Sequence, residues 1–153
     1  LTEKFDKLAE NNLQLTLSVS LHAPDDETRS KLMPANRGRG VAELMDACER
    51  YFRKTGRRIS FEYAMIDGVN DTPEQAKLLA GHAKRVAAHV NLIPLNHVDE
   101  RSLLPSSPER IKQFKAELER EGVNVTVRRR LGGDIDASCG QLRKKSLRLG
   151  DRA

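Results

Sequence analysis

The sequence predicts an α/β fold in which parallel strands alternate with helices. Segments of β-forming residues occur at 13–20, 59–66, 90–95 and 123–127, and amphipathic helical patterns separate them. The order is strand, helix, helix, strand, helix, strand, helix, strand. Such an order is typical of βαβ units, whose parallel strands are joined by right-handed crossovers.

The first strand and the segment after it have clear boundaries. Residues 13–20 (LQLTLSVS) alternate apolar and small polar side chains, which favours a strand. A short helix is expected to start at the acidic pair Asp25 and Asp26, which suits a helix N-terminus, and to end before Pro34. The following segment to Gly40 is predicted to be a loop.

A longer helix and the second strand come next. Apolar residues recur at helical spacing from Val41 to Phe52, and Cys48 on this face is predicted to be a core residue. Residues 59–66 (ISFEYAMI) form the second predicted strand. Glu62 lies inside this strand, so its carboxylate is either a polar contact in a barrel interior or faces solvent.

The second half continues the alternation. Thr72 begins a helix with a capping box and a proline at its first position, and the helix continues to Val86. The nearly uniformly apolar segment 90–95 is the third strand. Another helix starts at Ser107 and Pro108 and ends at Gly122, and 123–127 is the last strand. Four strands with their helices make about half of an eight-stranded barrel, or a small open α/β sheet.

Charge is distributed unevenly along the 153 residues. Residues 1–127 hold 19 basic and 19 acidic side chains, whereas residues 128–153 hold 8 basic and 3 acidic ones, which is the whole net charge of +5. We therefore divide the chain into a folded domain, 1–127, and a basic tail, 128–153. Such a tail is typical of proteins that bind a polyanion, although a solvated tail has the same composition. It contains no aromatic residue, so phosphate attraction is favoured over base stacking.

Several protein classes are disfavoured. No apolar run approaches the ~18 residues of a membrane helix, and the N-terminus has no signal-peptide layout. Two cysteines far apart in the sequence indicate a reducing, cytoplasmic location. Neither has a nearby cysteine or histidine, so no metal site is predicted. Because the chain starts at Leu1 without an initiator methionine, we expect it to be part of a longer protein.

Candidate binding residues stand where predicted strands end, since parallel sheets bind ligands at that edge. Ser20, Leu21 and His22 come at the end of the first strand. His22 is a candidate ligand, acid–base group or hydrogen-bond donor, or else a packing residue. The segment 67–70 follows the second strand. Asn96 follows the third, where an ordinary turn residue is the alternative.

The other candidate is Cys139, in the Gly-flanked segment 132–142 (GGDIDASCGQL). Basic clusters at 128–130 and 143–145 stand on either side of this segment. Nearby cations lower the pKa of a thiol and favour its nucleophilic thiolate. The alternative is that Cys139 is a small apolar residue in a mobile tail.

Four motifs occur in register: SVSLHAPDDETRSKLMP, FEYAMIDGVND, NLIPLN and GDIDASCGQL. Together they resemble the radical S-adenosylmethionine (SAM) enzymes that methylate carbon-2 of adenine in 23S ribosomal RNA and in some transfer RNAs. The resemblance covers essentially the whole chain and corresponds to the C-terminal half of that family. It implies the C-terminal half of a partial (β/α) barrel that holds SAM and a 4Fe–4S cluster.

The resemblance also assigns roles to residues and implies partners. Ser20, Leu21, His22 and Asn96 match positions that contact SAM, and Cys139 matches a catalytic cysteine that accepts a methyl group from one SAM. A second SAM, cleaved at the cluster, then supplies the radical that activates this methyl group for addition to adenine. The implied partners are ribosomal RNA, transfer RNA for some members, and a reducing protein such as flavodoxin; the full-length protein is expected to be a monomer.

Departures from the family pattern limit what the chain can do alone. The cluster-binding CxxxCxxC, the second catalytic cysteine and the N-terminal RNA-handling domain are absent from this sequence. We therefore expect the chain alone to be inactive and to expose apolar surface. Two alternatives stay open: a non-catalytic RNA-binding α/β module, and a methyltransferase of the same family that acts on carbon-8 of adenine.

Overall fold

The computed structural model describes residues 3–10, 15–33, 36, 38, 40–95 and 103–128. Five helices and four strands lie within them. The helices are α1 (Glu3–Glu10), α2 (Asp26–Leu32), α3 (Val41–Thr55), α4 (Pro73–Arg85) and α5 (Pro108–Arg120). The strands are β1 (Leu17–Ser20), β2 (Ile59–Met65), β3 (His89–Pro94) and β4 (Val125–Val127).

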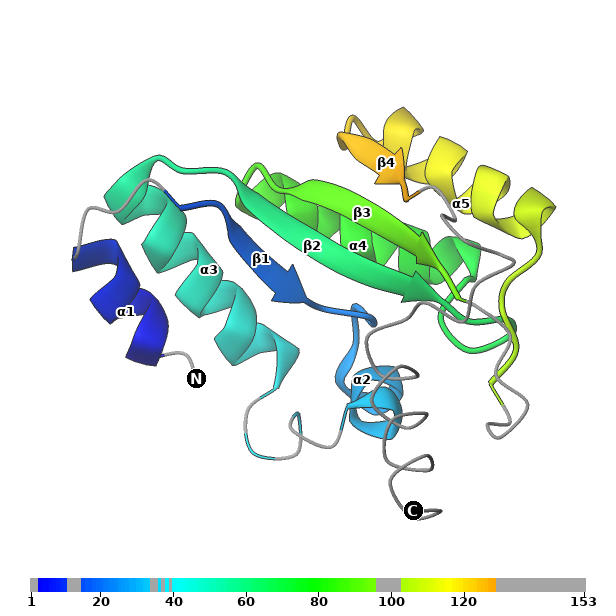
Figure 1. Ribbon diagram of the computed structural model, residues 1–153, viewed down its shortest axis with the longest axis horizontal. Coiled ribbons are helices and arrows are strands. Elements are labelled where there is room, and N and C mark those ends of the chain that lie inside the picture. Colours follow the sequence, from blue (N-terminus) through cyan, green and yellow to red (C-terminus); the bar gives the residue numbers. More distant parts are fainter. Residues whose placement is uncertain are drawn as a thin grey trace, which may run out of the picture.

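The strands form one parallel sheet in the order β1-β2-β3-β4, as Figure 1 shows. Because the strands are parallel and adjacent in sequence order, their carboxyl ends meet at one edge of the sheet. The short helix α2 lies beyond the carboxyl end of β1 (Figure 1). The predicted α/β class with parallel strands is thus confirmed.

β2 and β3 lie within one residue of the predicted strands, whereas β1, β4 and the N-terminal segment differ more. The first strand was predicted to begin at residue 13, but β1 begins at Leu17. Leu15 is half exposed, so the alternating apolar residues before Leu17 do not form a buried strand face. β4 begins at Val125, because the backbone N–H of Val123 still donates to Leu118 at the end of α5. Helix α1 was not predicted; its short apolar stripe, Phe5 and Ala9, is buried, and α1 contacts α3.

One face of the sheet forms the core. Figure 1 shows α4 behind β2 and β3, α3 along β1, and α5 along β4. The inward side chains of the strands and the apolar stripes of these helices belong to one buried cluster. Within it, Tyr63 stacks on Phe114 with ring centroids 5.4 Å apart. Cys48 is fully buried, as predicted, and burial raises the pKa of its thiol to about 12, so it stays protonated.

The opposite face is polar, and among the described elements no helix covers it (Figure 1). The register places Ser20, Glu62, Asn91 and Thr126 in one row across the four strands. Asn91 donates to the Glu62 carboxylate at 3.2 Å, and Thr126 donates to the Asn91 carbonyl. Glu62 is half-buried and paired with strand neighbours, which favours the barrel-interior interpretation of its position over free exposure to solvent.

Local capping chemistry fixes the helix starts as predicted. The Thr72 hydroxyl accepts from the backbone N–H of Gln75, whose side chain accepts from the Thr72 N–H in return, which completes a capping box. Asp25 and Ser107 cap α2 and α5 with a single side-chain bond each, accepting from the backbone N–H of Thr28 and of Arg110. These caps set where each helix leaves the carboxyl edge of the sheet.

Two neighbouring leucines of α4 test the one-sided core. Leu79 is fully buried, whereas Leu78 is 51% exposed. We expect Leu79→Ala to lower the free energy of unfolding by about 2–5 kcal/mol, since it leaves a cavity in the core. The matched control Leu78→Ala should change it by about 0.5 kcal/mol or less. Urea denaturation of the two variants measures the difference, and equal effects would contradict the assigned helix orientation.

Candidate functional site

The loop after β1 continues onto β2 at the carboxyl edge of the sheet. The backbone N–H groups of Leu21 and His22 both donate to the carbonyl oxygen of Glu62, at 3.1 and 3.3 Å. The chain then turns, and Ala23 donates back to Leu21 at 2.8 Å. The loop is therefore attached to the strand next to it.

His22 has a left-handed backbone conformation, with φ at 57°. This conformation is uncommon for a residue other than glycine and costs on the order of 1–3 kcal/mol unless its surroundings hold it. Two contacts do so. The imidazole Nδ1 accepts from the backbone N–H of Ala64 at 3.1 Å, and the His22 carbonyl accepts from Asn70 at 2.7 Å.

The same contacts determine what the imidazole can offer a ligand. Because Nδ1 accepts a hydrogen bond, the proton of the neutral ring is on Nε2. No residue in the described part of the chain hydrogen-bonds to Nε2. His22 thus presents one N–H donor to a ligand at the edge of the sheet.

Asn70 connects the strand ends. Its side chain is fully buried; Nδ2 donates to the carbonyls of His22 and Ala64, and Oδ1 accepts from the Ile66 N–H at 2.8 Å. Its own carbonyl accepts from the Tyr63 hydroxyl at 2.6 Å. The sequence indicated only that the segment 67–70 follows a strand; this connecting role depends on a contact with the loop after β1.

Arg29 supports the loop from the side of α2. Its guanidinium donates to the Leu21 carbonyl at 3.0 Å and to the Ser20 carbonyl at 3.3 Å. A third donor of the group binds the Asn36 carbonyl. Arg29 is only 8% exposed, so these three acceptors compensate its guanidinium for the water that burial removes. Sequence inspection did not identify it.

Asp26 anchors this arrangement to the start of α3. Its carboxylate accepts from Asn36 at 2.9 Å and from the Val41 N–H at 2.7 Å, and both bonds lower its pKa. A side chain at residue 40 would come within 2.8 Å of this carboxylate, so the glycine there allows the close approach. Asn36 thereby bridges the negative Asp26 and the positive Arg29.

His22 is held in its neutral form at neutral pH. Burial lowers the pKa of His22 first, and the positive charge of Arg29 lowers it further, while the Glu62 carboxylate raises it. A neutral imidazole is a hydrogen-bond donor at Nε2 without a net charge. It therefore suits an acceptor atom of a polar ligand.

The candidates predicted from sequence fall into three groups. Ser20 is exposed at the end of β1 and, with His22, presents a polar side chain at the edge. Leu21 is fully buried, and its N–H and carbonyl are bonded within the protein, so its predicted contact with SAM stays a prediction. Asn96, Cys139 and the basic tail 128–153, apart from Arg128, lie outside the described residues.

The described residues contain neither a cluster of metal-ligand side chains nor a membrane-spanning helix. Within the described ranges, no three histidine, cysteine or acidic side chains are grouped as metal ligands would be. Likewise, no helix in the described portion is long and apolar enough to cross a membrane.

Removing the Asn70 carboxamide tests its connecting role. Asn70→Ala leaves the Ile66 N–H and the carbonyls of His22 and Ala64 without this partner, so we expect the free energy of unfolding to fall by about 2–4 kcal/mol. The exposed Asn124→Ala is the control and should change it by about 0.5 kcal/mol or less. Chemical denaturation measures both, and a neutral Asn70→Ala would contradict the role.

The charge of Glu62 should be visible in the titration of His22. Since Glu62 raises the His22 pKa, Glu62→Gln is expected to lower it further, whereas Ser60→Ala, which keeps the charge, should not. The folded-state pKa lies below the unfolded value of about 6.5, so stability is lost as pH falls from about 6.5 towards the folded pKa. Histidine NMR titration measures the shift; a pKa that rises in Glu62→Gln would contradict the assignment.

Comparison with known proteins places this geometry in context. No protein-family profile matches the chain. Proteins named "Probable dual-specificity RNA methyltransferase RlmN" from Desulforamulus reducens, Caldanaerobacter subterraneus and Carboxydothermus hydrogenoformans are 49%, 51% and 53% identical to it. The matches cover 95%, 96% and 90% of this chain but only 41%, 43% and 40% of those proteins. The chain thus spans about two fifths of the length of these relatives.

Solved structures agree with this relationship. A radical SAM methyltransferase from Sphaerobacter thermophilus superposes with a TM-score of 0.87 at 47% identity, covering 92% of this chain and 41% of that one. A domain of pyruvate-formate lyase-activating enzyme from Bacteroides vulgatus has a TM-score of 0.65 at 19% identity, covering 83% and 74%, which shows a shared fold alone. The chain belongs to the RlmN-type family of radical SAM methyltransferases, as a region that corresponds to about two fifths of such a protein.

Proposed function

We propose that this chain is part of a radical SAM RNA methyltransferase that methylates carbon-2 of an adenine in 23S ribosomal RNA, and in transfer RNA. The observation that carries the proposal is the identity of about half of its residues with proteins named as dual-specificity RNA methyltransferases. The region has the fold of a radical SAM methyltransferase, which supports the reaction class. We infer a cytoplasmic, monomeric full-length protein.

The loop after β1 fits SAM. Ser20 offers an exposed hydroxyl and His22 an N–H donor at the carboxyl edge of the sheet, where parallel sheets bind ligands. SAM carries a carboxylate, ribose hydroxyls and ring nitrogens that can accept such donors. We propose that Ser20, His22 and Asn96 hold SAM, with Leu21 fixing the loop. Bound there, SAM supplies an electrophilic methyl group.

The residues described here do not fit an iron–sulfur cluster. The described segments hold no group of three or more potential ligands, and the buried Cys48 thiol has its pKa raised to about 12. We propose that the ligands of a 4Fe–4S cluster, together with the contact surface for a reductant such as flavodoxin, belong to the part of the protein that this chain does not cover.

We propose Cys139 as the methyl acceptor. Its thiol proton would pass to solvent, and the thiolate sulfur would bond to the methyl carbon as the bond between that carbon and the sulfonium sulfur of SAM breaks, with S-adenosylhomocysteine as the leaving group. Carbon-2 of adenine is not nucleophilic, so a protein-bound methyl group divides a difficult transfer into smaller steps. The basic residues on either side of Cys139 suit both a lowered thiol pKa and contact with the RNA backbone.

Peptide mass spectrometry of the full-length protein, expressed with an iron supply, tests this role. We expect a methyl group on the peptide that contains Cys139. The peptide that contains Cys48 is an internal control and should be unmodified, because that thiol is buried and protonated. Cys139→Ala should abolish RNA methylation while RNA affinity stays within about twofold. An unmethylated Cys139 in active, cluster-loaded protein would overturn its assignment.

The product separates the remaining alternatives. Nucleoside analysis of the methylated RNA should give 2-methyladenosine; 8-methyladenosine would instead favour the carbon-8 enzyme of the same family. RNA binding without any methylation by the cluster-loaded protein would favour the non-catalytic RNA-binding module.

A further inference from the structure

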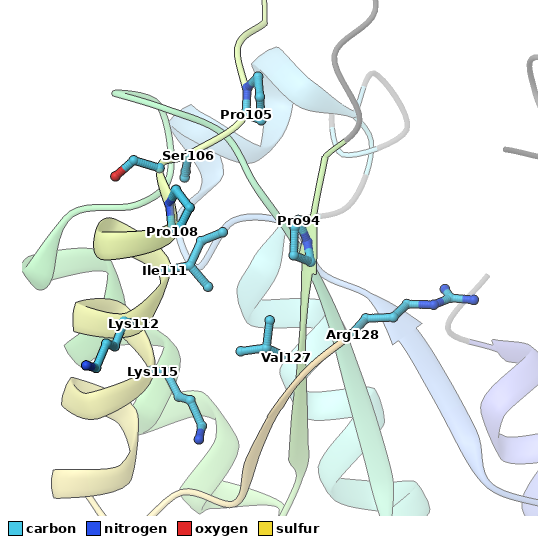
Figure 2. Close-up of a pocket in the computed structure, with 10 residues that line it drawn as sticks. Pro94, Pro105, Ser106, Pro108, Ile111, Lys112, Lys115, Val127 and Arg128 are labelled. Atoms are coloured by element: carbon cyan, nitrogen blue, oxygen red, sulfur yellow. The ribbon is translucent and has the colours of Figure 1, made fainter. Parts of the chain in front are cut away.

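A cavity of about 580 Å³ lies between α5 and the carboxyl ends of β3 and β4 (Figure 2). Its volume falls within the range of about 300–1,000 Å³ that is usual for sites of small organic groups. Figure 2 shows Ile111 of α5 and Val127 of β4 on its inner wall, with Pro94 at the end of β3. Pro105 and Pro108 complete its apolar lining. The cavity can therefore accept an apolar group.

Three cationic residues line the edges of this apolar centre. Figure 2 shows Lys112 and Lys115 on α5 and Arg128 after β4, with the charged ends of Lys112 and Arg128 directed away from the centre towards solvent. The Lys115 ammonium pairs with the Glu119 carboxylate at 3.1 Å, so part of its positive charge is neutralised within α5. Lys112 and Arg128 form no ion pair with any residue in the described ranges, and none of the described lining residues is acidic. A ligand that complements this lining has an apolar centre and carries negative charge on both sides of it.

The N-terminus of α5 adds further positive charge near the cavity. Ser107 caps the helix and Pro108 is its first residue, and both line the cavity. The N-terminus of a helix carries a partial positive charge, which favours a phosphate near it. The neighbouring Ser106 is engaged elsewhere, since its hydroxyl donates to Asp71 at 2.8 Å.

The cavity shares an edge of the sheet with the candidate site. Pro94 ends β3, Arg128 directly follows β4, and Pro105 pairs with Ile66 just beyond β2. β3 and β4 lie two and three strand spacings from β1. At about 4.7–4.9 Å per spacing, the cavity is roughly 10–15 Å from the loop after β1. A strand of nucleic acid carries one phosphate per about 3.4 Å when stacked, and an unstacked strand is more extended than this. The two places are thus a few nucleotides apart.

We propose that this cavity binds an unstacked base of the RNA substrate, a few nucleotides from the adenine that is methylated. This inference rests on the proposed function. RNA is recognised mainly through splayed bases that pack on side chains, including the planar guanidinium of arginine, while cations hold the adjoining phosphates. Here Pro94, Ile111 and Val127 contact the base, Arg128 stacks on it or pairs with one phosphate, and Lys112 and Lys115 pair with the next.

The test uses the cluster-loaded full-length protein and a short single-stranded RNA that contains the target adenine and 4-thiouridine. The variant is K112A/K115A/R128A. The matched control, R53A/K54A/K84A, removes the same kinds of charge from the last turns of α3 and α4, at the opposite edge of the sheet. Binding is measured against salt concentration, and photo-crosslinks are located by mass spectrometry.

We expect the cavity variant to weaken binding about tenfold or more and to reduce the slope of log affinity against log salt by about 1.4, since contacts to two phosphates of a single strand are lost. The control should bind as the unmodified protein does. Crosslinks should fall on residues 103–128. Equal effects of variant and control, or crosslinks confined to segments outside residues 103–128, would overturn the proposal. If the same protein still methylates the RNA, the proposed function is unaffected by that result. Absence of both binding and methylation in the unmodified protein would instead refute the proposed function and this site with it.

Discussion

The carboxamide of Asn70 is the interaction on which the site depends. It binds the carbonyl of His22 from one strand end and the carbonyl of Ala64 and the N–H of Ile66 from the next. Each of these backbone groups would otherwise be buried without a partner or lost to water, at a cost of about 1–3 kcal/mol. One side chain thus holds the left-handed loop residue, the end of β2 and the turn after it in a single arrangement.

The two faces of the sheet explain why such a loop is useful. Helices cover the apolar face, while the other face presents a hydrogen-bonded polar row that includes Glu62 and Asn91. The row of Ser20, Glu62, Asn91 and Thr126 thus lies on the face of the sheet that no described helix covers. Ser20 and His22 lie at the carboxyl edge of this sheet, and the loop that carries His22 is held to β2 by hydrogen bonds to Glu62 and Ala64.

Local rules account for what the sequence could predict. The capping box at Thr72, the proline at the start of α5 and the apolar face that contains Cys48 all depend on residues close in the chain. Four strands and four of the five described helices followed from such patterns. Helix α1 did not, because its eight residues are stabilised by burial against α3 rather than by strong end signals.

The site was predictable by position but not by geometry. Strand ends identified Ser20 and His22 and the segment that contains Asn70, because parallel strands bring their ends to one edge. The bond between Asn70 and His22 joins residues 48 apart, and Arg29 reaches back to Leu21 from α2. No local pattern encodes contacts of this kind, so the supporting residues emerged only from the three-dimensional arrangement.

The most direct test of this account is the state of the His22 imidazole in the full-length protein. Nitrogen-labelled histidine would be observed by NMR at neutral pH, before and after addition of SAM. The account predicts a neutral ring protonated on Nε2, whose Nε2 resonance shifts on addition of SAM while Nδ1 keeps its acceptor signature. A ring protonated on Nδ1, or an Nε2 resonance unchanged by saturating SAM, would contradict it.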